Sequence, residues 1–115
     1  MNVIEHAALA GAIFLLLCCS QANAEPDCGA PEQPKFPASL SSTEDADLLR
    51  DKVGTYLESS MSYRLCIASY VEERRSVISE TDLEELRQAY RDSLEEEKRV
   101  SKKWNRAFTK FLSKS

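Results

Sequence analysis

Apolar residues recur at helical spacing along two stretches of the chain. In the first stretch, placing residues at about 100° intervals gathers a broad, mainly apolar face. Its members are Leu49, Val53, Tyr56, Ser60, Tyr63, Ile67, Tyr70 and Val71. This pattern predicts a long core-facing helix over about 43–75. The segment Ser41–Asp45, which precedes it, holds Ser-x-x-Glu and Ser-x-x-Asp, both typical of a helix start.

The second stretch predicts another long helix, over about 82–112. Its apolar face holds Leu83, Leu86, Tyr90, Leu94, Trp104, Phe108 and Phe111. If one helix ran through both stretches, this face would be rotated by roughly 140° from the first. We therefore expect a turn within 76–80 and a new capping box at Thr81-x-x-Glu84. Two helices of similar length with a short connection predict an antiparallel hairpin over 43–115.

An apolar run at residues 7–19 lies near the N-terminus. It is shorter than the roughly 20 residues that span a bilayer, and the small-x-small site Ala22-Asn23-Ala24 follows it. The pattern predicts a signal peptide over 1–24, although the start of the chain has no Lys or Arg. The alternatives are a retained anchor and a lipid anchor on Cys18 or Cys19, which the preceding leucines disfavour. We expect a secreted or periplasmic protein.

The next segment, residues 25–42, is rich in proline and favours an extended polyproline conformation. The predicted mature chain keeps two cysteines, Cys28 and Cys66, and in an exported protein such a pair indicates one disulfide. Fully extended, the segment reaches about 43 Å from Cys28 to Ser42, and Cys66 lies about 36 Å along the helix. The segment is therefore expected to double back along the first helix and to place Phe36 over its apolar face.

These elements together define the expected fold class. It is an all-α, antiparallel two-helix hairpin with an extended Pro-rich N-terminal arm tied on by one disulfide. A chain of about 90 residues is near the size at which a hydrophobic core alone is marginal, so a covalent link helps.

Charge is distributed in blocks along the chain. The net charge is −4, and removing residues 1–24 leaves 18 acidic against 15 basic residues. A basic C-terminal tract comprises Lys98, Arg99, Lys102, Lys103, Arg106, Lys110 and Lys114, and the first helix begins with an acidic block. An antiparallel hairpin sets the two blocks side by side. We therefore favour pairing with the acidic block inside the protein as the role of the tract, over binding of nucleic acid or anionic lipid. No nucleic-acid partner is expected.

Polar residues interrupt both predicted apolar faces at mid-length. The hairpin geometry brings Glu97 opposite Ser60, and the expected polar layer consists of Tyr56, Ser60, Tyr63, Glu97 and Ser101. Such a layer serves either as a small ligand pocket around the carboxylate or as a buried hydrogen-bonded group that fixes the register of the helices. The second interpretation is favoured.

Catalytic and metal-binding motifs are absent from the predicted mature sequence. It has no histidine, no Cys-x-x-Cys and no Gly-rich phosphate loop. The sequence therefore predicts a protein that is not an enzyme and that takes no metal or cofactor.

A set of short motifs resembles a group of small, uncharacterised periplasmic helical proteins of proteobacteria. The motifs are Cys28 with the spaced prolines, Tyr63-x-x-Cys66 and Trp104-Asn105-x-x-Phe108-x-x-Phe111. The resemblance covers most of the mature chain. It implies a signal peptide, a proline-containing arm and a helical fold, and it implies no activity.

Three functions follow as hypotheses. The first is a non-enzymatic interaction protein of the periplasm or cell envelope, with an unknown protein partner. The second is a chaperone-like holdase that uses apolar side chains on the far side of the first helix, namely Met61, Leu65 and Ala68. Homodimer formation or cover from the arm explains these three residues equally well. The third is a binder of anionic lipid or nucleic acid through the basic tract.

Overall fold

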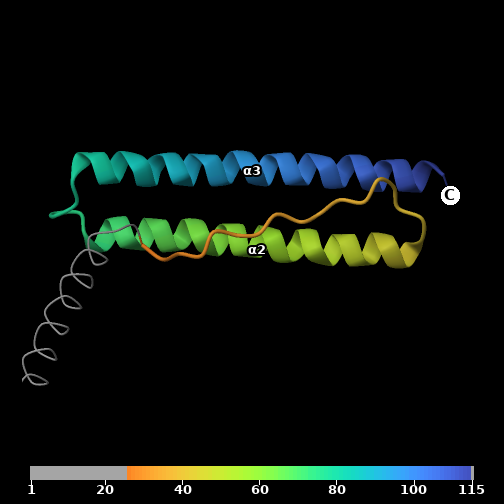
Figure 1. The fold of residues 1–115 in the computed structure, drawn as a ribbon, viewed down its shortest axis with the longest axis horizontal. Coiled ribbons are helices and arrows are strands. Elements are labelled where there is room, and N and C mark those ends of the chain that lie inside the picture. The colour runs from red at the N-terminus through yellow and green to blue at the C-terminus, as the bar shows by residue number, and fades with distance from the viewer. Residues whose placement is uncertain (1–25, 115) are drawn as a thin grey trace, which may run out of the picture.

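The computed structural model describes residues 26–114. Within that range the chain forms two long antiparallel helices, α2 (Thr43–Glu73) and α3 (Glu80–Ser113), which pack side by side without any strand (Figure 1). The predicted all-α hairpin is therefore confirmed. The predicted signal peptide over 1–24 lies outside the described residues. Neither α2 nor α3 is apolar over a stretch long enough to cross a membrane.

Helix α2 begins where the sequence predicts, because Ser42 acts as its N-cap. The Ser42 Oγ accepts a hydrogen bond of 3.1 Å from the Asp45 N–H, and the Asp45 carboxylate accepts one of 3.2 Å from the Ser41 N–H. This is the predicted Ser-x-x-Asp pattern. The helix ends at Glu73, two residues before the predicted end, because the Arg74 N–H bonds to the carbonyls of Tyr70 and Val71 as a C-cap.

Helix α3 begins two residues earlier than predicted. Its N-cap is Ser79, whose Oγ accepts a hydrogen bond of 3.1 Å from the Asp82 N–H. The predicted capping box at Thr81-x-x-Glu84 is therefore wrong, since Thr81 already lies in the first turn of the helix. The Val77 and Ile78 N–H groups both bond to the Arg74 carbonyl, so the chain reverses within 74–79 and reaches Ser79 directly.

The face of α3 that packs against α2 differs from the predicted one. The buried residues of α3 are Leu86, Ser93 and Val100, which lie seven residues apart. Three members of the predicted apolar face, Tyr90, Leu94 and Phe108, are instead 36–38% exposed. Residues seven positions apart lie on one line along a helix, and in a long pair of helices this line is the line of contact. The apolar stripe of α3 is consequently turned partly away from α2.

The main core lies at the end of the hairpin away from the connecting turn. It consists of Leu40, Ala46, Leu49, Val53, Tyr56 and Val100, with Phe36, Leu57, Trp104, Ala107 and Phe111 packed around it. Phe36 and Leu40 come from the segment before α2, so this segment completes the core.

Residues 26–42 form an extended arm that runs back along the hairpin (Figure 1). The predicted disulfide between Cys28 and Cys66 holds its far end, with the two Cα atoms 5.6 Å apart. The arm also reaches α3, because the Gln33 side chain donates to the Glu96 carboxylate and the Lys103 Nζ lies 5.8 Å from the centre of the Phe36 ring. One side of the hairpin is thus covered by the arm.

Candidate functional site

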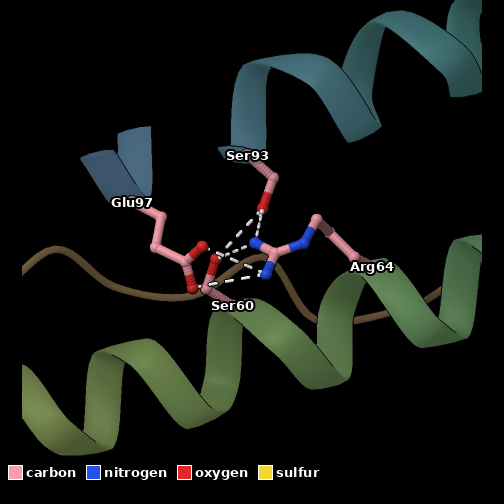
Figure 2. Close-up of polar contacts among 4 residues, drawn as sticks. All are labelled: Ser60, Arg64, Ser93 and Glu97. Atoms are coloured by element: carbon pink, nitrogen blue, oxygen red, sulfur yellow. Dashed lines mark hydrogen bonds and ion pairs between the residues drawn. The ribbon is translucent and has the colours of Figure 1, made fainter. Parts of the chain in front are cut away.

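Four polar side chains meet between the helices at mid-length (Figure 2). The Arg64 Nη1 donates to the Ser60 Oγ at 2.7 Å and to the Ser93 Oγ at 3.2 Å, and the two hydroxyls lie 3.1 Å apart. The Arg64 Nη2 donates to both carboxylate oxygens of Glu97, at 3.3 and 3.2 Å. The guanidinium therefore bridges two hydroxyls and one carboxylate.

This cluster is largely buried. Ser60 is 0%, Arg64 8% and Ser93 9% exposed, and the Glu97 side chain is 24% exposed. Every buried side-chain nitrogen and oxygen of residues 26–114 has a hydrogen-bond partner. Because an arginine cannot shed its proton in a protein, the buried guanidinium needs its partners to remain in place. The arrangement suits a structural polar layer that fixes the register of α2 against α3.

The structure assembles the predicted polar layer only in part. Ser60 and Glu97 belong to it, but the guanidinium of Arg64 connects them. Tyr63 and Ser101 are half-buried, and their side chains make no hydrogen bond within the described part of the chain. Sequence reasoning missed Arg64 and Ser93. A signal was present, because Ser60–Arg64 and Ser93–Glu97 are both pairs four residues apart, which share one side of a helix.

Tyr56 lies next to the polar layer and is only 3% exposed. Burial raises the pKa of the Tyr56 hydroxyl above its ordinary value of 10.0, and the Glu96 and Glu97 carboxylates raise it further. A hydrogen bond with Ser60 and the charge of Arg64 act in the opposite direction. The tyrosine is therefore held in its neutral form.

The basic tract does not form the predicted ion pairs with the acidic start of α2. Within residues 26–114 the Arg64–Glu97 pair is the single salt bridge that joins the two helices. Of the seven basic residues, Arg99 pairs with Glu96 on its own helix at 2.5 Å. The others of the tract make no ion pair inside this part of the chain, so their charge faces solvent.

The side of the hairpin opposite the arm carries most of the exposed apolar side chains. We call it the open face and define it by Leu57, Met61, Leu65, Ala68, Tyr90, Leu94, Phe108 and Leu112. By helical spacing, six of the eight large hydrophobic residues that are exposed within 26–114 fall on this side, including Met61 at 56% and Leu65 at 61% exposure. The alternative in which the arm covers Met61, Leu65 and Ala68 is wrong, because all three are exposed and the arm lies on the other side of the hairpin.

Two surface grooves follow the line between the helices on the open face. One is lined by Leu57, Glu58, Met61, Glu97, Lys98, Ser101, Lys102 and Asn105. The other, nearer the turn, is lined by Ile67, Ala68, Val71, Leu83, Leu86, Arg87, Tyr90 and Arg91. Leu65 and Leu94 lie between these grooves by helical spacing, four residues from Met61 and Tyr90 respectively. Both grooves have charged residues along their rims, and we call the two together the channel.

These features define a class of protein, a small helical hairpin with a disulfide-held arm on one side and the channel on the other. No protein-family model, curated protein or solved structure matches the chain. The resemblance to small periplasmic helical proteins of proteobacteria stays a prediction.

Proposed function

We propose that this chain is a small exported, non-enzymatic protein that acts by binding another protein through its open face. The observation that carries the proposal is the concentration of exposed apolar side chains on that one face. Single exposed apolar residues are ordinary, but a contiguous patch on a small protein is typical of an interaction site.

The form of the channel favours a helical partner. It runs between the two antiparallel helices, and its apolar members recur every three or four residues along α2 and along the part of α3 near the turn. Farther from the turn, α3 contributes polar and charged residues, including Lys98 and Lys102. An amphipathic helix places its own apolar side chains at the same spacing, so it fills such a channel along its length.

The polar layer supports a non-enzymatic role. Its guanidinium, its carboxylate and its two hydroxyls are all engaged with one another. A catalytic group needs a free hydrogen-bonding position toward a substrate. Here the contact between the helices occupies the two hydroxyls and the guanidinium, and the Glu97 carboxylate, which keeps 24% exposure, is bound by Arg64.

Export is supported by two independent features. The N-terminal sequence has the apolar run and small-x-small site of a signal peptide. The described chain holds the disulfide between Cys28 and Cys66, and such bonds persist mainly in oxidising compartments.

Binding to an anionic lipid surface is a second candidate. It is favoured by the basic residues of α3 that have no acidic partner within residues 26–114. However, Lys98 and Lys102 line the channel, whereas Lys103 stands over Phe36 on the arm side. A surface binder gathers its charge on one side, so this distribution ranks the second candidate below protein binding.

Two matched substitutions test the proposal. Leu65 and Leu48 are 61% and 59% exposed on the same helix, but only Leu65 lies on the open face. A photo-crosslinking residue at position 65 should join the exported protein to a defined protein partner, and Leu65→Glu should abolish co-purification of that partner. The same changes at Leu48 should do neither. Equal behaviour at the two positions would overturn the proposal.

A further inference from the structure

We infer that the partner on the open face is a second copy of this chain. Two hairpins pack open face to open face as a four-helix bundle, in which α2 of one copy lies against α3 of the other. This inference rests on the proposed function above and names its partner. It follows from the direction of the apolar stripes, from the charges on the rims and from the available area.

The apolar stripe of α3 points in the direction that a four-helix bundle requires. Tyr90, Leu94 and Phe108 lie beside the line of contact with α2, so the hairpin alone leaves them 36–38% exposed. On α2, Met61 lines the groove on the same side, and Leu65, four residues on, falls on that side by helical spacing. A helix in a four-helix bundle buries a stripe wide enough to meet two neighbours, and these stripes have that width.

The rims of the channel carry opposite charges at the same level. Glu58 on the α2 side and Lys98 and Lys102 on the α3 side line one groove. None of these three forms an ion pair within residues 26–114. Each rim therefore has unused charge of the sign that would attract the other rim.

This charge pattern selects one of the two symmetric arrangements. A twofold axis parallel to the helices places α2 of each copy over α3 of the partner at the same level, so Glu58 meets Lys98 and Lys102 of the other copy. A twofold axis across the helices places α2 over α2 and brings acidic rim against acidic rim. Because like charges in contact are unfavourable, the first arrangement is selected.

The polar layer agrees with the same arrangement. Glu97 belongs to the layer and also lines the channel, where its side chain keeps 24% exposure. With α2 over α3 of the partner, Arg64 of each copy comes to the level of Glu97 of the other. Two Arg–Glu pairs then meet at the centre of the bundle and fix its register, a known use of buried polar groups.

The side of the hairpin that carries the open face is large enough for a stable dimer. Helix α2 has 31 residues, which corresponds to a length of about 46 Å. Two helices side by side are about 20 Å wide, so the whole side of the hairpin, of which the open face is a part, offers about 900 Å² in each copy. Stable interfaces bury about 800 Å² per partner.

The first test is the oligomeric state of the protein, purified after export so that its own processing and disulfide are retained. Sedimentation over a concentration series should show a monomer–dimer equilibrium. Leu65→Glu should raise the dimer dissociation constant by about 30-fold or more, because a charge is buried at the centre of the interface. Leu48→Glu, at matched exposure, should change it by less than about 3-fold. Unchanged circular dichroism confirms that both variants fold.

The second test exchanges charges across the rims. Glu58→Lys faces two lysines of the partner, and symmetry repeats the change, so the dissociation constant should rise by about 10-fold. Combining Glu58→Lys with Lys98→Glu and Lys102→Glu should restore dimerisation to within about 3-fold of the original. In the α2-on-α2 arrangement Glu58→Lys replaces one like-charge contact by another, so the dissociation constant of the variant should change little, whereas a mixture of the variant and the unmodified chain should dimerise more tightly.

The outcomes separate this inference from the proposed function. A dimer that responds to Leu65→Glu and recovers in the charge-swapped variant supports both. A monomer at all concentrations, whose Leu65 still crosslinks to a different protein, overturns the inference and leaves the proposed function standing. A monomer with no Leu65-specific crosslink overturns both.

Discussion

The Arg64 Nη2 lies 3.2 Å from the Glu97 Oε2, and this contact joins α2 to α3 at mid-length. Arg64 is 8% exposed, whereas the salt bridges elsewhere on the two helices involve side chains that are mostly more than half exposed. The partners of a buried charge matter more than those of an exposed one, because water cannot replace them.

Removing the carboxylate should therefore destabilise the hairpin. We expect Glu97→Gln to lower the free energy of unfolding by about 1–3 kcal/mol, since it leaves the Arg64 guanidinium buried without its counter-ion. Urea denaturation measures the change. Glu84→Gln is the control, because its pairs with Arg87 and Arg91 are exposed and should be worth less than about 1 kcal/mol. Equal effects of the two substitutions would contradict the structural role of the layer.

Loss of the disulfide should destabilise the protein without melting the helices. Cys28 and Cys66 are 38 residues apart, so the bond closes a long loop. We expect the double variant Cys28→Ser, Cys66→Ser to lose about 2–4 kcal/mol of unfolding free energy. Far-UV circular dichroism should retain most of the helical signal, and chemical shifts of Phe36 and Leu40 should report a released arm. A variant with wild-type stability would show that the arm holds its place without the bond.

The two glycines of the described chain should respond to alanine in opposite directions. Gly54 lies inside α2, and a Cβ there would meet no atom within 4 Å. Gly54→Ala should therefore raise the unfolding free energy by about 0.5–1 kcal/mol. Gly29 has a φ of +66°, which alanine rarely adopts, so Gly29→Ala should lower stability. Denaturant unfolding of both variants gives the signs, and a loss at Gly54 would indicate an unrecognised contact.

The raised pKa of Tyr56 predicts a loss of stability at high pH. Since the folded state holds the hydroxyl proton more tightly than the unfolded state, the stabilising contribution is complete below about pH 10 and is lost as the pH rises through the folded-state pKa. Unfolding free energies at pH 9 and pH 11 should fall more steeply for the wild-type chain than for Tyr56→Phe. If the unfolding free energies of the two proteins fell equally between pH 9 and pH 11, ionisation of Tyr56 would not be the cause of the loss.

Much of this fold is predictable because each element has a local cause. Ser42 and Asp45 start α2 through side-chain hydrogen bonds that the sequence itself specifies. The change of phase between the apolar stripes requires a turn, and one pair of cysteines allows one disulfide. The start of α3 was misplaced because Ser79 and Thr81 both fit an N-cap. The hydrogen bonds that close the turn at Arg74 decide between them.

The sites were less predictable because they depend on which way each helix is rotated. A prediction from one helix uses the mean direction of all its apolar residues. That mean direction placed Tyr90 and Leu94 in the core. The line of contact instead follows Leu86, Ser93 and Val100, and a stripe drawn from apolar residues alone cannot contain Ser93. Arg64 was missed for the same reason. A cation is expected on a core-facing side only where a carboxylate lies opposite, and the rotation of the helices brings Glu97 to that position.

The disulfide also determines what happens to the protein when a protease cuts the arm. Lys35 is exposed in the arm, between Cys28 and the start of α2. A protease that cuts after it would sever the backbone, yet the short N-terminal piece would stay attached to α2 through its sulfur. The nicked molecule would migrate as one species on a non-reducing gel and as two after reduction, so the arm can be opened by proteolysis without being shed.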